Sequence, residues 1–435
     1  MLTNYLLILI LIIFYLYLFN FSIYPISLAF PVFTIFVGLL FLENNLSVKI
    51  YFFLALELLI IGYYLGVKKI KKKYKKLFIP YNIRPVIRTN NPSVEYYSFW
   101  ILSIMYTCLF IYHMVKMGIP IIRNTEIDRF NFIGSGLFGI PGRIYLYGLP
   151  FLFIFTFVYK EAVINSHKHF KYLFSFIFLV FVISRILGGF KSGLINIVAL
   201  IILAKITLYG PINFFNIIKE YFIFIIVSIC YALWMSTKFS SILNIYSSLG
   251  KYFFERVFII PALPSVFIFS NNMFNGYFLY FLNDIKYYFG RYFNLFKPDN
   301  FPTVKIISAY IYNTPLTETS FLVPVTITSV SELYLNFGFI VSLILILFIG
   351  YIFGRIFFIS RIKNNYLQIA MLIVIQDAFI EFITKGNLFY IIFNYSLMIA
   401  LTFLLYMTLK LLIKLSVFYI KYYGFPNVLM GKQVR

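Results

Sequence analysis

Five cations lie in short connections between apolar segments that the charge pattern places on the outer face of a membrane, where Lys and Arg are normally scarce. They are Arg123, Arg129, Arg143, Arg185 and Lys191. Arginine can hold phosphate oxygens with two parallel hydrogen bonds, and lysine supplies a compact charge. Near a low-dielectric boundary, such groups can stabilise a departing pyrophosphate. We therefore expect these residues to bind a phosphorylated ligand.

The elements that must position these cations are apolar helices. Of the 435 residues, 62% are hydrophobic and 12% are charged, too few for a water-soluble surface. We predict an all-α, polytopic helical membrane protein with about eleven (ten to twelve) spans. The predicted spans are 2–19, 23–42, 48–66, 97–117, 144–159, 172–187, 194–209, 221–235, 333–354, 366–383 and 388–409.

The connection 67–96 fixes the orientation, because its dense run of Lys and Arg is typical of a cytoplasmic loop. Alternation from there puts the N-terminus outside and the C-terminal tail inside. We expect three parts: 1–235 with spans one to eight and this basic loop, 236–331 as one large periplasmic loop, and 332–435 with spans nine to eleven and the cytoplasmic tail.

The large loop contains an apolar pattern at helical spacing, which predicts an amphipathic helix on the membrane surface. Its apolar residues are Phe278, Phe281, Leu282, Ile285, Phe289 and Tyr292, and on its other side lie Asn283, Asp284, Lys286 and Arg291. The apolar stretch 257–269 is short and contains two prolines, so a re-entrant or interfacial segment is favoured over a span.

The candidate pyrophosphate-binding residues are Arg185, Lys191, Arg256, Arg143 and Arg291. Arg185 and Lys191 are favoured because they share one turn, 184–193, whose glycines let the backbone approach a ligand. Each cation alone also fits a helix-end residue that reaches lipid headgroups.

A transfer reaction at this site also needs a base that takes a proton from an attacking hydroxyl. The candidate catalytic carboxylates are Glu318 and Glu332. We expect no cofactor and no metal, since Cys108 and Cys230 fall inside apolar segments and form no ligand pair. The net charge of +23 is explained by topology and anionic lipid, not by nucleic acid.

Three carboxylates fall within predicted spans: Glu57, Asp377 and Glu381. A charged residue such as Asp costs roughly 2.5 to 3.5 kcal/mol near the centre of a spanning helix. Asp377 and Glu381 are four residues apart, so they share a helix face near the outer end and can pair with a cation such as Lys385. Helix packing and catalysis both remain open for them.

Three stretches resemble the oligosaccharide repeat-unit polymerases of the Wzy type. The segment from Asn313-Thr-Pro to Ser331-Glu-Leu-Tyr-Leu-Asn-Phe-Gly-Phe339 resembles their carboxyl-terminal signature. The turn Gly188-Gly-Phe-Lys-Ser-Gly193 is similar to their Gly-x-Arg/Lys-Ser turn, and Arg256-Val-Phe-Ile-Ile-Pro261 to a looser third element. The resemblance covers order and layout from about the fifth span to the end.

The resemblance implies a metal-free C-type glycosyltransferase at the outer face of the bacterial inner membrane. Such enzymes join undecaprenyl-pyrophosphate-linked oligosaccharide units into O-antigen or capsular polysaccharide and release undecaprenyl pyrophosphate; a chain-length regulator protein is an expected partner. The match carries over to Lys191 and, by position, to Arg185, Arg256 and Glu332. Lys191 stands where many relatives have Arg, which retains the charge but loses the bidentate geometry.

Two other classes remain open. An O-antigen ligase would use the same donor and a lipid A-core acceptor, and the turn into 334–338 argues mildly against it. A flippase or transporter would show a large central cavity, internal duplication and charges along several helices. With no internal repeat and one dominant outer loop, the sequence fits that class poorly.

Overall fold

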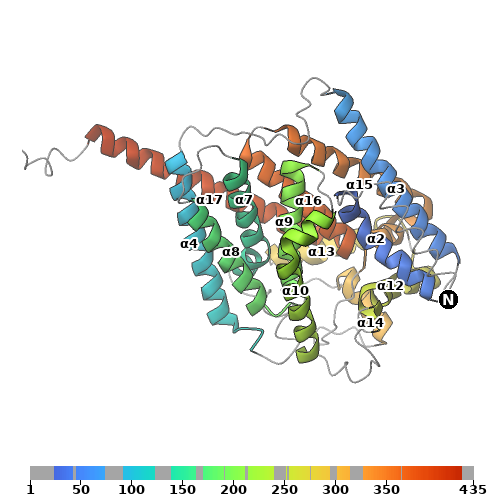
Figure 1. Cartoon of the computed structure of the whole chain (residues 1–435). Coiled ribbons are helices and arrows are strands. Elements are labelled where there is room, and N and C mark those ends of the chain that lie inside the picture. The colour runs from blue at the N-terminus through green and yellow to red at the C-terminus, as the bar shows by residue number, and fades with distance from the viewer. Residues whose placement is uncertain are drawn as a thin grey trace, which may run out of the picture.

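The computed structural model of the protein describes residues 24–42, 46–73, 92–122, 139–162, 170–190, 192–210, 214–239, 251, 254–274, 276–293, 301–313, 327–363 and 365–423. Every element in these ranges is helical (Figure 1). The elements are α2 (Tyr24–Phe41), α3 (Leu46–Lys73), α4 (Pro92–Met117), α6 (Ile140–Arg143), η3 (Ile144–Gly148), α7 (Leu149–Ala162), α8 (Phe170–Leu187), α9 (Gly193–Tyr209), α10 (Phe214–Phe239), η5 (Glu255–Ile259), α12 (Ile260–Ser270), α13 (Leu279–Phe293), α14 (Thr303–Tyr312), α15 (Ser329–Ile362), α16 (Tyr366–Lys385) and α17 (Leu388–Tyr423).

Seven of the described helices are long and apolar enough to cross a membrane, so the protein is a multi-pass helical membrane protein. They cover Leu46–Ile70, Ser93–Met117, Ile140–Glu161, Phe170–Leu187, Ser329–Ile362, Tyr366–Lys385 and Leu388–Phe418. Ala29–Phe41 and Gly193–Tyr209 are shorter apolar helices at two further predicted spans. The predicted span 2–19 lies outside the described residues, and the count of eleven stays a prediction.

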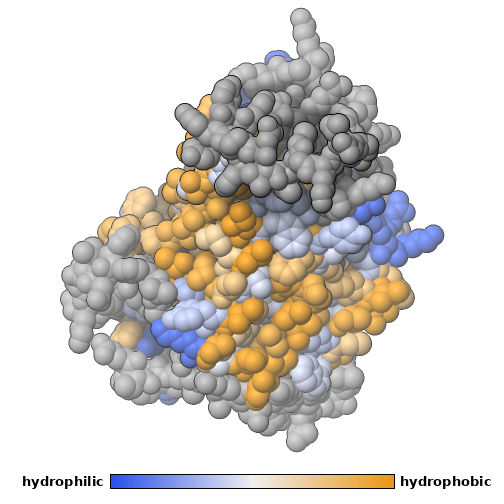
Figure 2. Space-filling model, turned by 90° about the vertical axis from the view of Figure 1, so that its left-hand side faces the viewer, coloured by the Kyte–Doolittle hydropathy of each residue, from blue (hydrophilic) through white to orange (hydrophobic). Residues whose placement is uncertain are grey.

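The outer surface of the bundle is apolar where a lipid chain would contact it. On α4, Ile101, Ile104 and Ile111 are exposed, and on α8 Leu179 and Ile183 are exposed. Figure 2 views the side of the molecule where these two helices lie and shows apolar atoms across the middle of that face. Because a bilayer offers no competing hydrogen bonds, such side chains are stable there.

Helices α3 and α15 approach each other through glycines. Gly62 and Gly66 of α3 and Gly350 and Gly354 of α15 are each spaced four residues apart, so each pair lies on one helix face. A Cβ atom on Gly350 would lie 2.2 Å from the carbonyl oxygen of Leu59, and one on Gly62 would lie 2.1 Å from a carbonyl oxygen of α15. The two backbones are therefore in direct contact, as in small-xxx-small packing of membrane helices.

Helix α15 is broken at Gly338. This residue has φ 69° and ψ −170°, a conformation outside the helical region that glycine adopts readily. The segment before the break, 329–337, is almost wholly buried, and the segment after it, 339–362, carries the two glycines that contact α3. The span expected at 333–354 is thus two helical segments with different directions.

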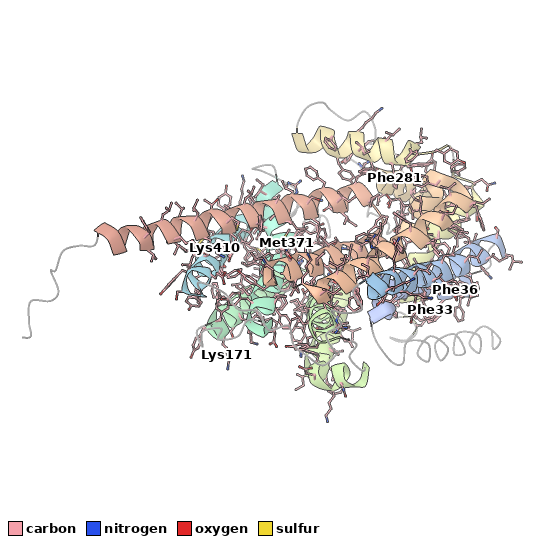
Figure 3. All side chains as sticks on the ribbon, turned by 90° about the horizontal axis from the view of Figure 1, so that it is seen from above. Phe33, Phe36, Lys171, Phe281, Met371 and Lys410 are labelled. Atoms are coloured by element: carbon pink, nitrogen blue, oxygen red, sulfur yellow. The ribbon has the colours of Figure 1, made fainter. Side chains whose placement is uncertain are left out.

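Helix α13 forms where the apolar spacing predicted an amphipathic helix, and it lies against the start of α17 (Figure 3). The ring of Phe281 is 5.3 Å from that of Phe389, and the rings of Tyr288 and Tyr390 are 5.5 Å apart. Its exposed face carries Leu282 and Phe289 together with Lys286. The prediction that Asp284 lies on a polar outer side is wrong, because Asp284 is buried against the start of α14. The apolar stretch 257–269 is also helical, in η5 and α12.

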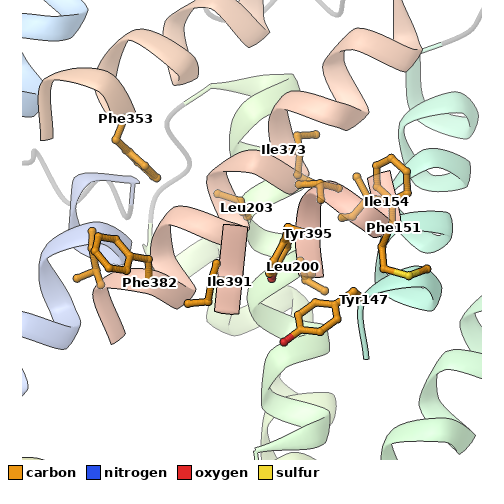
Figure 4. Close-up of a cluster of buried hydrophobic side chains, with 14 of the residues drawn as sticks. Tyr147, Phe151, Ile154, Leu200, Leu203, Phe353, Ile373, Phe382, Ile391 and Tyr395 are labelled. Atoms are coloured by element: carbon orange, nitrogen blue, oxygen red, sulfur yellow. The ribbon is translucent and has the colours of Figure 1, made fainter. Parts of the chain in front are cut away.

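The core between α7, α9, α16 and α17 is packed with aliphatic and aromatic side chains (Figure 4). Phe151 and Ile154 of α7, Leu200 of α9 and Ile373 of α16 are all buried. The ring of Tyr395, from α17, lies among these side chains. A phenol hydroxyl in such surroundings needs a hydrogen-bond partner, and its partners define the site described below.

Replacing Gly350 with Ala tests the contact between α3 and α15. The added methyl group meets a backbone oxygen that cannot move without separating the helices, so we expect Gly350→Ala to destabilise the protein by about 3 kcal/mol. The measurement is the midpoint of thermal unfolding in detergent. Ile344→Ala is the control, because Ile344 is exposed on the same helix. Equal midpoints for the two variants would contradict direct backbone contact.

Candidate functional site

The structure describes only part of the predicted site. Arg143, Arg185 and Glu332 are buried, and Arg256 is half-buried in η5. Arg291 belongs to α13, but its side chain is not described. The remaining candidates, which lie outside the described residues, are Arg123, Arg129, Lys191 and Glu318.

Arg185 lies in the last turn of α8 and is buried in the bundle. One of its terminal nitrogens, Nη2, donates to the carbonyl oxygen of Leu146 at 2.9 Å. The guanidinium carbon lies 5.3 Å from the ring centre of Tyr145 and 5.0 Å from that of Phe181, distances typical of cation–π contact. Its Nε is buried and has no hydrogen-bond partner among the described residues. Arg185 is thus oriented by neighbouring groups and retains an unused donor.

The glycines of the turn after α8 have a structural explanation. A Cβ atom on Gly188 would lie 1.8 Å from the hydroxyl oxygen of Tyr145, and one on Gly193 would lie 3.0 Å from the carbonyl oxygen of Arg185. Both positions are filled by the protein itself. The glycines therefore allow the turn to pack against Arg185 and Tyr145, a role different from the ligand approach expected from the sequence.

Arg143 ends the short helix α6, beside the start of η3. Its Nε donates to the side-chain oxygen of Asn394 on α17 at 2.7 Å, and its guanidinium carbon lies 5.7 Å from the ring centre of Phe393. Asn394 in turn donates to the carbonyl oxygen of Tyr390, within its own helix. The second buried arginine is therefore held by α17, next to Tyr395 in the sequence.

The two carboxylates of α16 meet at one tyrosine. The hydroxyl oxygen of Tyr395 lies 2.7 Å from Oδ2 of Asp377 and 2.6 Å from Oε2 of Glu381. Lys385 donates to Oε1 of Glu381 at 2.5 Å, which confirms the pairing expected from the spacing. The ring of Tyr147, from η3, is 4.9 Å from that of Tyr395 (Figure 4).

These groups form one polar cluster at one end of the bundle. The positive charge of Arg185 acts on both Asp377 and Glu381, although no salt bridge joins them. We use the name Tyr395 cluster for Arg185, Asp377, Glu381 and Tyr395; Arg143 is held by Asn394, the residue before Tyr395 in α17. One arginine from α8 and two carboxylates from α16 thus meet at a tyrosine of α17.

Arg256 belongs to a different part of the bundle. It lies in η5, which packs against α2 and α12, whereas Arg185 lies on α8, which packs against α4, α7 and α9. At Gly38 of α2, a Cβ atom would lie 1.9 Å from the carbonyl oxygen of Phe258, so η5 is held tightly to α2. Because η5 and α8 pack against different helices, their packing does not place Arg256 opposite Arg185.

Glu332 has the contacts of a helix cap. Its Oε1 accepts the backbone N–H of Leu388, the first residue of α17, at 3.1 Å. A carboxylate is favoured there because the first N–H groups of a helix lack partners within the helix and carry a partial positive charge. Its Oε2 is buried, with no partner among the described residues, and a Cβ atom on Gly386 would lie 2.8 Å from it. The base role of Glu332 stays a prediction.

Asn336 and Asp284 also accept backbone N–H groups at the start of a helix, α13 and α14 respectively. The side-chain oxygen of Asn336 accepts the backbone N–H of Phe281 at 2.8 Å and its carbonyl oxygen accepts that of Phe278 at 3.0 Å, at the start of α13. Asp284 accepts the backbone N–H of Thr303 at 2.7 Å and its hydroxyl at 3.0 Å, at the start of α14. Burial raises the pKa of the Asp284 carboxyl to about 6, although both Thr303 bonds favour its charged form.

Sequence reasoning missed Tyr395, Tyr147 and Asn394. An amide or a hydroxyl inside an otherwise apolar span is a usable signal, since such groups seek partners within the bundle. That signal identifies Asn394. It does not separate Tyr395 from the many other tyrosines of this chain.

Comparison with protein-family models, with curated proteins and with solved structures finds no match for this chain.

The buried carboxyl group of Asp284 predicts a pH dependence of stability. The pKa in the folded state, about 6, lies above the ordinary value of 3.8, so the folded protein holds this proton more tightly than the unfolded chain. The contribution of Asp284 to stability therefore falls as the pH rises from about 4 to about 6, by up to about 3 kcal/mol. Asp284→Asn keeps an acceptor for Thr303 and removes this dependence. We expect the variant to gain thermal stability relative to the wild type between pH 4.5 and pH 7.5. A constant difference between the two midpoints across that range would contradict the assignment.

Proposed function

We propose that this protein is a membrane-embedded glycosyltransferase of the repeat-unit polymerase type. It takes oligosaccharide units linked to a polyprenyl pyrophosphate, transfers the growing chain to the incoming unit and releases the lipid pyrophosphate. The observation that carries the proposal is the pair of buried arginines, Arg143 and Arg185, held at one end of an apolar bundle. The resemblance of segments 188–193 and 313–339 to Wzy-type polymerases supports it.

The two buried arginines suit a leaving group that becomes more negative during the reaction. Arg143 and Arg185 are oriented before a ligand arrives, by Asn394 and by the carbonyl oxygen of Leu146. Donors that need no rearrangement stabilise developing charge most effectively, and more so where water is excluded. A pyrophosphate bound here would therefore need no divalent metal ion to leave.

The lipid part of such a substrate needs a continuous apolar surface. Exposed apolar side chains of α13, including Leu282 and Phe289, adjoin α17, where Ile392 is exposed. The rings of Phe289 and Phe393 are 6.4 Å apart, and Phe393 contacts Arg143. A polyprenyl chain lying along α13 and α17 would thus reach the cluster without leaving the bilayer.

The proposed setting is the bacterial inner membrane, with the Tyr395 cluster facing the periplasm. Lys410 and Glu95 pair at 2.9 Å near the opposite end of α17, which the charge pattern assigns to the cytoplasm. An O-antigen ligase and a flippase remain the alternatives. Loss of a polymerase leaves single repeat units, loss of a ligase leaves long carrier-linked polymer, and loss of a flippase traps units inside the cell.

The decisive experiment supplies the purified protein in lipid nanodiscs with a polyprenyl-pyrophosphate-linked repeat unit. A ladder of longer saccharides and the release of polyprenyl pyrophosphate are the expected products. Intact substrate after prolonged incubation would contradict the proposal.

Arg143→Gln and Arg185→Gln test the pyrophosphate contact. Glutamine removes the charge but can still donate hydrogen bonds, so we expect each variant to insert and fold while its polymerisation rate falls at least about 10²-fold. Rates come from the saccharide ladder in nanodiscs. Lys171→Gln is the matched control, because Lys171 is an exposed cation on the same helix as Arg185. Wild-type rates in both arginine variants would exclude these residues from the site.

A further inference from the structure

We propose that Asp377 is the base that takes the proton from the attacking hydroxyl, with Tyr395 and Glu381 completing the proton-accepting unit. The proposal rests on the function proposed above and adds the residue that function requires. Arg143 and Arg185 keep their proposed role in binding the pyrophosphate. Asp377 and Glu381, for which the sequence left helix packing and catalysis open, gain a catalytic role.

The two carboxylates around the Tyr395 hydroxyl can accept one proton between them. Its hydroxyl oxygen is within 2.7 Å of Asp377 and 2.6 Å of Glu381, yet a hydroxyl group has a single hydrogen to donate. With both carboxylates ionised, one of these two short contacts has no hydrogen. When Asp377 gains a proton, it donates to the Tyr395 oxygen, and Tyr395 donates to Glu381. The hydrogen bonding is therefore complete only after one proton has been taken up.

The two carboxylates are not equivalent. Glu381 has a salt bridge with Lys385, whose charge balances its own. Asp377 has no salt bridge with any described residue. Because Lys385 stabilises the ionised form of Glu381, the incoming proton goes to Asp377.

A second observation points to a ligand at this place. Arg185 is 6% exposed, its charge acts on both carboxylates, and its Nε is buried without a hydrogen-bond partner among the described residues. An unused buried donor is costly unless something fills it. A phosphate oxygen on Arg185 would bring the leaving group and the base to the same end of the bundle. Among the described residues, the other titratable groups that act on Asp377 are Tyr395 from α17, and Glu381 and Lys385 from its own helix. Tyr147 from η3 lies against the ring of Tyr395.

The acceptor hydroxyl gives its proton to a carboxylate oxygen of Asp377, and its oxygen forms a bond to the anomeric carbon of the donor sugar. The bond between that carbon and the pyrophosphate oxygen breaks, and the electron pair leaves with the polyprenyl pyrophosphate. Arg143 and Arg185 stabilise the added negative charge, and the proton passes from Asp377 to water afterwards.

The test compares Asp377→Asn with Asp284→Asn in nanodiscs. Both replace a carboxylate by an isosteric amide; Asp284 is buried, Asp377 is half-buried, and Asp284 lies outside the Tyr395 cluster. We expect Asp377→Asn to lower the turnover at least about 10²-fold, while its affinity for free polyprenyl pyrophosphate stays within about twofold of the wild type. Asp284→Asn should retain wild-type turnover. A wild-type rate in Asp377→Asn overturns the proposal and leaves the polymerase function standing.

Two further measurements separate a base from a structural residue. Formate should restore turnover to Asp377→Ala, because it can enter the space left by the carboxylate and accept the proton.

The pH–rate profile is the second measurement. Its acid limb should be absent in Asp377→Asn. Tyr395→Phe should alter the profile without loss of pyrophosphate binding. Loss of binding together with turnover, with no rescue by formate, would show that Asp377 is structural. If the wild type itself leaves the lipid-linked unit intact, both the polymerase function and this proposal fail.

Discussion

The direct contact between the backbones of α3 and α15 is the constraint on which the rest of the molecule depends. In a bilayer, helices gain little from hiding apolar side chains from one another, so close packing must hold them together. Gly62 and Gly350 allow that packing because neither carries a side chain. This contact fixes the segment 339–362 of α15. The break at Gly338 then sets the direction of the other segment, 329–337.

That segment organises the neighbouring helices by satisfying their free N–H groups. Glu332 binds the start of α17, and Asn336 binds the start of α13. Within a membrane an unsatisfied backbone group costs several kcal/mol, so these contacts specify where each helix begins. Asn394 and Tyr395 both belong to α17. Their position therefore depends on the contact between Glu332 of α15 and the start of α17.

The sequence predicted the helical class, the positions of most described helices and the pairing of Glu381 with Lys385, because apolar runs and i,i+4 spacing are local properties. It also identified Arg143 and Arg185 as cations that need an explanation. It did not predict the break at Gly338 or the cap by Glu332, because both depend on contacts between residues distant in the chain. Arg256 shows the same limit, since its distance from Arg185 along the chain says nothing about the side of the bundle on which η5 packs.

Helix α17 runs without a proline or glycine from Leu388 to Tyr423, a length of about 54 Å against a hydrocarbon core of about 30 Å. Figure 1 shows its far end projecting beyond the other helices. An uninterrupted helix of this kind behaves as a rigid rod over short displacements. Tyr395 near one end and Lys410 toward the other therefore move together along the axis. A displacement of the projecting end along this axis would therefore shift Tyr395 and its contacts with α16.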